Sequence, residues 1–251
     1  FTSVPFDKDV TDDALWQRMG GGQGRDFDVF AVNTAELQRY LNEGIAAPLD
    51  PARLSRTRDQ LPTFRNALLI PGLSRNGQVF GVPYTYAYMG LIYNRNLVKE
   101  IPDSLLALWD PRYQGQVLAF DASSHNFSLA ALSQGRSPFR LEEKDWKPLV
   151  QHLVALRRNV LSFYTLPEEV VELFRDNPVA LVFANYGSQQ VQALRNAGAD
   201  IGYVIPKEGA LAWLDCWAIS SKTPRRELAD AWINYTLEPQ VSRLLPSRPG
   251  L

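Results

Sequence analysis

The segment from Trp213 to Asp215 places an aromatic ring and a carboxylate inside an otherwise apolar stretch. A carboxylate within an apolar strand costs free energy unless it meets a partner. In a strand, residues i and i+2 share one face, so both side chains are expected to point the same way. Such a pair suits an ammonium group, through a cation–π attraction of about 0.5–2 kcal/mol and a charge-assisted hydrogen bond of about 1.5–3 kcal/mol. We therefore predict an amine site here; a structural ion pair with an arginine is the alternative.

Three tyrosines alternate along the chain at Tyr84, Tyr86 and Tyr88, so on a strand they share one face. Packing of the rings against the core or the sheet is one interpretation. The other is an aromatic wall beside a ligand, for which tyrosine is suited because it is apolar with a polar tip.

Polar residues follow several short apolar runs that we expect to be buried strands, at 27–32, 116–120 and 179–184. Each run precedes a segment with helical spacing. In sheets of this kind, ligands bind beyond the carboxyl ends of strands, near helix N-termini. The candidate binding residues in these loops are Asn33, Thr34, Asp121, Ser123, His125, Asn185 and Tyr186.

Strand-like and helix-like segments alternate along the whole chain, which predicts an α/β architecture with mainly parallel sheets. Further strands are expected within 76–94 and at 201–205 and 210–219. Helices are expected at 12–19, after Thr34 as a capping residue, and at 125–132, 166–174, 188–197 and 226–237. The opening residues 1–4 also resemble a strand, so we expect the sequence to start inside its domain.

The composition excludes several classes of protein. The chain has 251 residues, enough for one large or two modest domains, and 26 basic against 27 acidic residues give a net charge of −1. That balance argues against nucleic acid or an anionic membrane as the partner. One cysteine and two histidines exclude an internal disulfide and a thiolate metal cluster, and make a histidine-based metal site an unfavoured interpretation. We expect no cofactor and no metal.

Local motifs give no support to catalysis. The glycine-rich run 20–24 lacks the third glycine of a dinucleotide loop and precedes a strand instead of following one, so we interpret it as a plain loop. Cys216 sits in an apolar segment and is expected to be a buried thiol. A Ser/His/Asp triad with distant members stays open, but no local motif favours one. The charge-free stretch 76–94 contains glycine, proline and tyrosine, so we expect strands there and no membrane span.

Four stretches together carry a resemblance to a known family: Phe27–Val29 with Asn33-Thr34 and Gly44, Gly81–Tyr86 with Tyr93-Asn94-Arg95, Leu108–Gly115 with Asp121, and Pro206–Gly209 with Trp213-Leu214-Asp215. The chain resembles the extracytoplasmic solute-binding proteins of bacterial ABC importers, of the spermidine/putrescine-binding type. The resemblance implies a two-lobed periplasmic binding protein fold of type II with mixed, mainly parallel sheets and a hinge of crossing strands. The lobes would be residues 1–93 plus 215–251, and residues 94–214.

The resemblance also implies a location and partners. A small amine-bearing solute would be captured between the lobes by hinge closure, and the membrane permease subunits of the importer would recognise the closed form. We expect a periplasmic protein that is a monomer. No basic-then-apolar leader opens the chain, so a secretory signal is expected to be absent or already removed. The family's first strand, before Phe1, and its last helices, beyond Leu251, are expected to be missing; a neighbour's strand could fill the gap in the sheet.

Several departures from the family pattern bear on the solute. Polyamine binders carry an acidic pair after the strand that ends before Asp121, and the matching positions here are Ala122 and His125. An expected aromatic residue is replaced by Asn185, with Tyr186 adjacent, and an expected tyrosine by Ala35. With Asp215 retained, one amine keeps its partner and a second loses it. We therefore expect a smaller or zwitterionic amine, an amino acid or ω-amino acid, whose carboxylate would meet His125 and arginine side chains.

The leading hypothesis is therefore a binding protein for an amine-bearing solute, without catalytic activity. Trp213 and Asp215 would fix the amine, and Tyr84 and Tyr86 would pack along its chain. Two alternatives remain: a ferric-iron-binding protein, with tyrosine phenolates and an imidazole as ligands, and an enzyme or sensor domain on the same scaffold.

Overall fold

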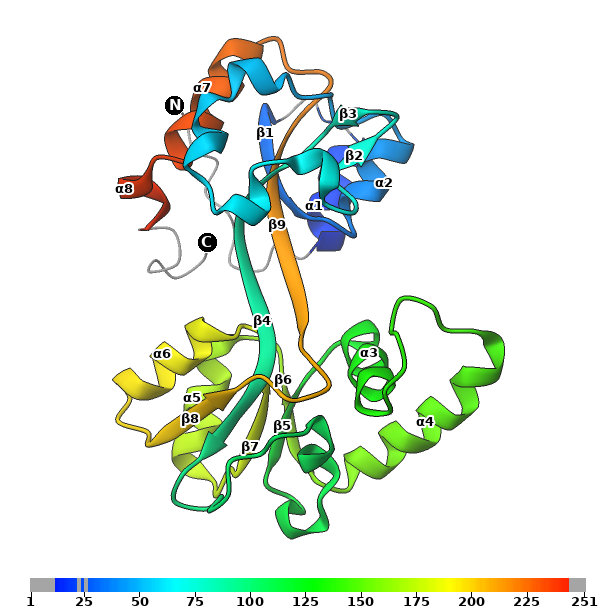
Figure 1. The fold of residues 1–251 in the computed structure, drawn as a ribbon, viewed down its shortest axis with the longest axis vertical. Helices are drawn as coiled ribbons and strands as arrows, with labels where there is room; N and C mark the ends of the chain where they lie inside the picture. Colours follow the sequence, from blue (N-terminus) through cyan, green and yellow to red (C-terminus); the bar gives the residue numbers. More distant parts are fainter. Residues whose placement is uncertain (1–11, 22–23, 25–26, 244–251) are drawn as a thin grey trace. The chain divides into compact units, whose positions relative to one another are not determined.

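The computed structural model describes residues 12–21, 24 and 27–243 (Figure 1). The chain forms two compact units: unit 1 comprises Phe1–Tyr86 and Trp213–Leu251, and unit 2 comprises Ala87–Ala212. The division expected from the sequence lies nearby, after Tyr93 and before Asp215, and remains a prediction. The expected strand at residues 1–4 lies outside the described residues.

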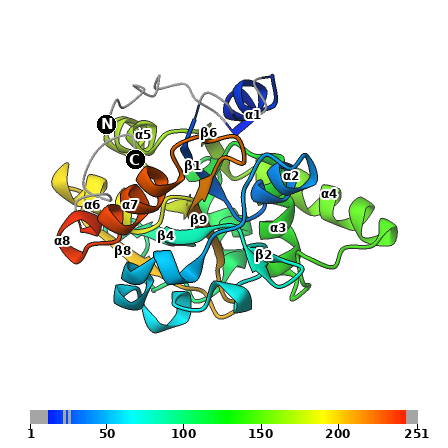
Figure 2. The same cartoon turned by 90° about the horizontal axis from the view of Figure 1, so that it is seen from above.

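Unit 1 is built around three strands in the order β1-β9-β4, namely Val29–Asn33, Leu211–Ile219 and Val82–Asn94. Figure 2 shows β1 and β9 lying between α2 (Leu37–Asn42) on one side and α7 (Arg226–Thr236) on the other. The remaining elements of this unit are α1 (Asp12–Gly21), β2 (Ser74–Arg75), β3 (Gln78–Val79), α8 (Pro239–Ser242) and 3-10 turns at Pro51–Arg53, Ser55–Asp59, Pro62–Phe64 and Ala67–Leu69.

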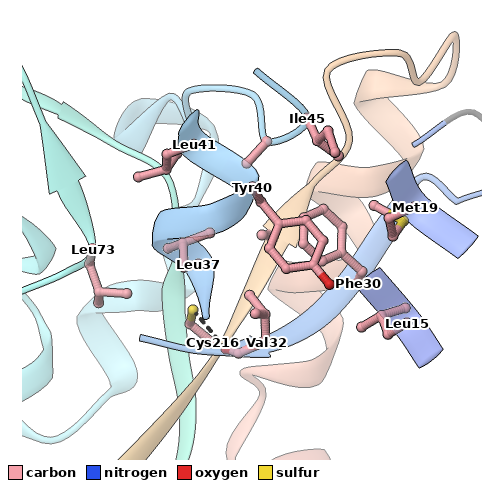
Figure 3. Packing of buried hydrophobic residues seen from close by; sticks show 12 residues of the cluster. Leu15, Met19, Phe30, Val32, Leu37, Tyr40, Leu41, Ile45, Leu73 and Cys216 are labelled. Carbon is pink, nitrogen blue, oxygen red and sulfur yellow. Dashed lines mark hydrogen bonds between the residues drawn. The ribbon is translucent and has the colours of Figure 1, made fainter. Parts of the chain in front are cut away.

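Each face of β9 carries its own buried cluster. On one face, Cys216 and Ala218 pack with residues of β1, α1 and α2, among them Phe30 and Tyr40, whose ring centroids are 5.0 Å apart (Figure 3). The Cys216 thiol donates to the Val32 carbonyl over 3.1 Å, and burial raises its pKa. The expected burial of this thiol is confirmed, and a thiol that stays protonated is a poor nucleophile.

Unit 2 contains the rest of β4, which pairs with β7 (Leu181–Ala184) and β8 (Ile201–Val204), followed by β5 (Val117–Phe120) and β6 (Val160–Tyr164). One face is covered by α5 (Pro167–Asp176) and α6 (Ser188–Asn196). The other helices are α3 (Ser123–Ser133) and α4 (Glu143–Arg157), which pack on one another, with 3-10 turns at Leu105–Trp109 and Pro111–Tyr113.

The sheet is mixed, but its antiparallel share is larger than the sequence led us to expect. Among the described pairings, only β5 runs parallel to its neighbours, β6 and β7. β1 pairs antiparallel with β9, and β4 pairs antiparallel with β7 and β8. The reason is that helical crossovers join only β5, β6 and β7 in sequence, whereas β4 and β9 carry the chain from one unit into the other.

Most expected elements lie within a few residues of their predicted bounds, and three differences have local causes. The helix after β1 begins only at Leu37, and Asn33 instead of Thr34 accepts the N–H groups of the preceding turn. The first two residues of the glycine run extend α1, whose last residue is Gly21. Helix α4 and strand β6 were not predicted; Pro148, inside α4, interrupts the helical pattern.

A substitution at Gly90 tests the pairing of β4 with β8. A Cβ atom there would lie 2.6 Å from the Val204 carbonyl oxygen, a backbone atom that cannot move without breaking the ladder. Gly90→Ala is therefore expected to lower the free energy of unfolding by about 1–3 kcal/mol in urea titrations. Gly20→Ala is the matched control, because a Cβ atom at that position would meet no atom within 4 Å; it should be neutral or stabilising by about 0.5–1 kcal/mol. Equal effects of the two variants would contradict the pairing.

Candidate ligand-binding site

The unit 1 part of the site lies on the face of β9 opposite Cys216. The β1–β9 register pairs Ala31 with Trp217 and Asn33 with Asp215. Because side chains alternate along a strand, the pairs at 31/217 and 33/215 share one face. Trp217 belongs to the buried cluster that also contains Ile219 and packs against α7. This face therefore passes from an apolar core at Trp217 to polar side chains at Asn33 and Asp215.

Asn33 and Asp215 form a close cross-strand pair. The Thr34 N–H donates to the Leu214 carbonyl over 3.1 Å, so those two residues are the hydrogen-bonded pair of the ladder. The adjoining Asn33–Asp215 pair is then a non-hydrogen-bonded pair, in which the two Cα atoms are typically about 4.5 Å apart. The Asn33 carboxamide oxygen accepts the N–H groups of Ala35 at 3.0 Å and Glu36 at 2.9 Å. The turn after β1 thus fixes the orientation of the Asn33 side chain beside Asp215.

Tyr84 and Trp217 form a stacked pair next to Asp215. Their ring centroids are 4.2 Å apart and their planes are inclined by 19°. Burial raises the pKa of the Tyr84 phenol, and the Asp215 carboxylate raises it further, so the phenol stays neutral. The Trp217 side chain is only 8% exposed, and its indole N–H has no partner within the described residues.

Sequence reasoning missed Trp217, although a signal was present. It lies two residues beyond Asp215 and four beyond Trp213, so the strand alternation alone would have put all three on one face.

The other expected unit 1 residues lie on β9 and β4 and in the turn after β1. Trp213 is half-buried in β9, and Thr34 is half-buried in the turn after β1. Tyr86 is exposed on β4, and its ring centroid lies 5.0 Å from that of Phe64. Tyr88, also exposed, follows the boundary between the units.

The unit 2 part of the site gathers at one edge of the parallel strands. Because β7, β5 and β6 run parallel, their carboxyl ends lie at the same edge, and α6, α3 and α5 begin there. The structure therefore brings together the residues expected from separate loops. Asp121 and Ser123 are exposed, His125 and Tyr186 are half-buried, and Asn185 is buried.

Phe120 is the hydrophobic centre of this edge. Its ring makes edge contacts with three others, at centroid distances of 5.2 Å to His125, 5.6 Å to Tyr164 and 5.9 Å to Tyr186. Phe120 and Tyr164 were not predicted as site residues, because nothing local in either segment shows that two strand ends meet.

The tyrosine hydroxyls at this edge hold the loops together. The Tyr164 hydroxyl donates to the Phe183 carbonyl at 2.6 Å and accepts the Asn185 N–H at 2.9 Å. The Tyr186 hydroxyl donates to the Thr165 carbonyl at 2.6 Å. Burial raises the pKa of both phenols. These groups therefore remain protonated and tie the loop after β7 to β6 and its following loop.

The unit 2 edge is acidic. The loops and helix starts at 121–125, 164–169 and 185–188 contain Asp121, Glu168 and Glu169 and no lysine or arginine. Glu169 caps α5 by accepting the N–H of Thr165 at 2.7 Å, and the charge of Glu168 contributes to the raised pKa of Tyr186. Burial lowers the pKa of His125, so its imidazole is neutral near pH 7. The local charge favours a cationic group.

Two features, a metal-binding cluster and a membrane-spanning helix, are absent from the described residues. Within residues 12–21, 24 and 27–243, no group of three or more histidine, cysteine, aspartate or glutamate side chains is arranged to hold a metal ion. In the same part of the chain, no helix has the length and apolar character needed to cross a bilayer.

The family model of the bacterial extracellular solute-binding proteins matches residues 9–244. The chain belongs to this family. It is 27% identical over 225 residues to spermidine/putrescine-binding periplasmic protein 1 of Haemophilus influenzae, covering 89% of this chain and 60% of that protein. It is 26% identical over 227 residues to the spermidine/putrescine-binding periplasmic protein of Escherichia coli K12, covering 89% and 62%. The chain thus spans about three fifths of the length of these relatives.

Solved structures share the fold. The substrate-binding protein PotD of a spermidine/putrescine ABC transporter from Streptococcus pneumoniae superposes with a TM-score of 0.78 at 23% identity, covering 94% of this chain and 69% of that one. A periplasmic binding protein from Agrobacterium tumefaciens, solved with agropinic acid, has a TM-score of 0.68 at 18% identity, covering 95% and 69%. The expected α/β fold of a periplasmic binding protein is confirmed.

The buried histidine predicts a pH dependence of stability. Because the folded-state pKa of His125 lies below its unfolded value of about 6.5, the unfolded chain binds more protons below that pH, and stability falls as pH falls. His152, whose pKa is also lowered by burial, acts in the same direction. Urea unfolding of the wild type between about pH 7 and pH 5 should show this loss. His125→Asn should reduce the slope, and an unchanged slope would show that His125 does not contribute.

Proposed function

We propose that this chain binds a small amine-bearing solute for an ABC importer, outside the cytoplasm and without catalysing a reaction. The observation that carries the proposal is the Asp215 carboxylate at the end of an aromatic core, beside Asn33, Tyr84 and Trp217 on one face of unit 1. Membership of the solute-binding family and the polyamine-binding names of its relatives support it. Membrane permease subunits would be its protein partners.

The roles of the residues follow from their chemistry. Asp215 accepts hydrogen bonds from the ammonium group, while Trp213 and Tyr84 offer aromatic faces. Tyr86 extends the aromatic surface along β4 for the carbon chain of the solute. Asn33, Thr34, Ser123 and Asn185 supply polar groups, and Tyr186 supplies a half-buried ring at the unit 2 edge.

The unit 2 edge bears on the class of amine. The loops at this edge contain no arginine or lysine that could pair with the carboxylate of a zwitterionic solute, and burial keeps His125 neutral near pH 7. Asp121 and Glu168 instead add negative charge there. We therefore favour a solute whose charged groups are amines over an amino acid or ω-amino acid.

Neither alternative function gains support from the site. Ferric iron requires tyrosine phenolates, whereas Tyr164 and Tyr186 use their hydroxyl protons to bind backbone carbonyls, and burial raises the pKa of both. Nucleophilic catalysis by a thiol gains no support, because Cys216 is buried on the opposite face of β9.

Asp215→Asn tests the central role. The variant keeps the shape of the side chain but removes its charge, so binding of putrescine measured by calorimetry should weaken roughly 10- to 100-fold. Glu100→Gln is the matched control, because Glu100 is an exposed carboxylate of unit 2 with no hydrogen bond or ion pair among the described residues. If Asp215→Asn bound putrescine like the wild type, the assignment of Asp215 would be wrong.

Restoring the acidic pair tests the unit 2 edge. Ala122 is the N-cap residue of α3 and His125 lies in its first turn, so Asp and Glu are compatible with the helix there. Ala122→Asp with His125→Glu is expected to tighten spermidine binding at least about tenfold, because a second ammonium gains a carboxylate. The uncharged pair Ala122→Ser with His125→Gln should give no gain. An unchanged spermidine affinity in the acidic variant would show that this edge does not face an amine.

A further inference from the structure

Helix α4 carries an exposed apolar stripe. Leu149 and Leu156 point inward, and Leu149 packs with Ala130 and Ala131 of α3. On another side of the helix, Trp146, Val150 and Val154 follow one another at intervals of four residues and are 46%, 45% and 59% exposed. Residues four apart lie one above the other on a helix, so these side chains form a continuous ridge. Contiguous exposed apolar side chains are candidates for a contact surface.

Opposite charges lie at the two ends of the same ridge. Glu143 precedes Trp146 by three residues, and Arg157 follows Val154 by three, so both lie in line with the apolar side chains. Glu143 is exposed and forms no ion pair within the described residues. The Arg157 guanidinium donates to the Val160 carbonyl at 3.1 Å and lies over the Phe163 ring at 5.7 Å. These contacts hold the Arg157 side chain in place at the end of the ridge.

The pattern is self-complementary about Val150. Glu143 and Arg157 lie seven residues to either side of it, and Trp146 and Val154 lie four to either side. In an antiparallel pair of two α4 helices with a twofold axis at Val150, Trp146 of each copy meets Val154 of the other. Each Glu143 meets an Arg157, and the helix dipoles oppose one another favourably. A twofold interface requires this reciprocity, in which residue i contacts j and j contacts i.

We propose that the α4 ridge, defined by Glu143, Trp146, Val150, Val154 and Arg157, is the contact surface of a twofold dimer of this chain. The sequence led us to expect a monomer, and the ridge supports a different state. One helix pair covers less area than the roughly 1,200–2,000 Å² of a stable interface, so the association is weak and depends on concentration. The proposal is independent of the solute and of the proposed function.

Sedimentation of the full chain over a range of concentrations tests the dimer. The wild type should pass from monomer to dimer with a dissociation constant on the order of 10–1,000 μM. Val150→Asp puts two like charges on the twofold axis and should abolish the dimer. Ala155→Asp, on a different exposed side of the same helix, adds the same charge and should leave the dimer intact. A wild type that stays monomeric at the highest concentration, or equal effects of the two variants, overturns the proposal.

A charge swap gives a sharper test of the orientation. Glu143→Arg and Arg157→Glu each place like charges opposite one another, so each variant alone should dimerise several-fold more weakly than the wild type. An equimolar mixture of the two should regain the wild-type association, because each interface contact then joins opposite charges. Thermal melts of Arg157→Glu check that loss of its contact with Phe163 leaves the fold intact. A mixture that associates no better than the separate variants overturns the twofold arrangement about Val150.

Discussion

The architecture of unit 1 depends on β9 lying in register between β1 and β4, with a buried cluster on each of its faces. Cys216 and Ala218 belong to one cluster, and Trp217 and Ile219 to the other. A slip of one residue would exchange the two faces and place Asp215 in the core. Gly81 tightens this constraint, because a Cβ there would lie 2.7 Å from the Cys216 sulfur. The register thus makes the position of Asp215 a consequence of how the core packs.

Unit 2 positions its side chains by a different constraint, the parallel pairing of β5 with β6 and β7. Parallel strands need helical crossovers, and these bring three helix N-termini to the edge where the strands end. Helix N-termini favour anions, yet the loops at this edge carry Asp121 and Glu168. Part of that acidity serves the helices themselves, as Glu169 shows by capping α5. In the proposed function, the remaining carboxylates are the ones that would act on a solute.

The sequence was most informative where function and local pattern coincide. The alternation from Trp213 to Asp215 and the polar residues after apolar runs follow from strand geometry alone, and the described structure has them on strand β9 and at strand ends. Trp217, Phe120 and Tyr164 were not predicted, because their roles come from contacts between distant segments. Tyr84 stacks on Trp217, and Phe120 contacts the rings of Tyr164, at the end of β6, and Tyr186, in the loop after β7. The prediction that Thr34 caps the following helix was wrong. The side-chain oxygen of Asn33, one position earlier, accepts the N–H groups of the turn instead. Helix α4 was not predicted because Pro148 interrupts the helical spacing of its apolar residues.

The coupling between Asp215 and Tyr84 shows what a carboxylate does at this place beside the core. Its charge raises the pKa of a phenol that burial has already made hard to ionise, so the local field around the stacked pair is negative. An ammonium group that reaches Asp215 offsets this field, whereas an anion adds to it. A positive charge bound at Asp215 would therefore lower the pKa of Tyr84, because it offsets the negative charge that raises it. In the proposed function, a preference for cations would therefore come from the aromatic pair beside the carboxylate as well as from the carboxylate itself, because stacking against Trp217 holds the Tyr84 ring in place.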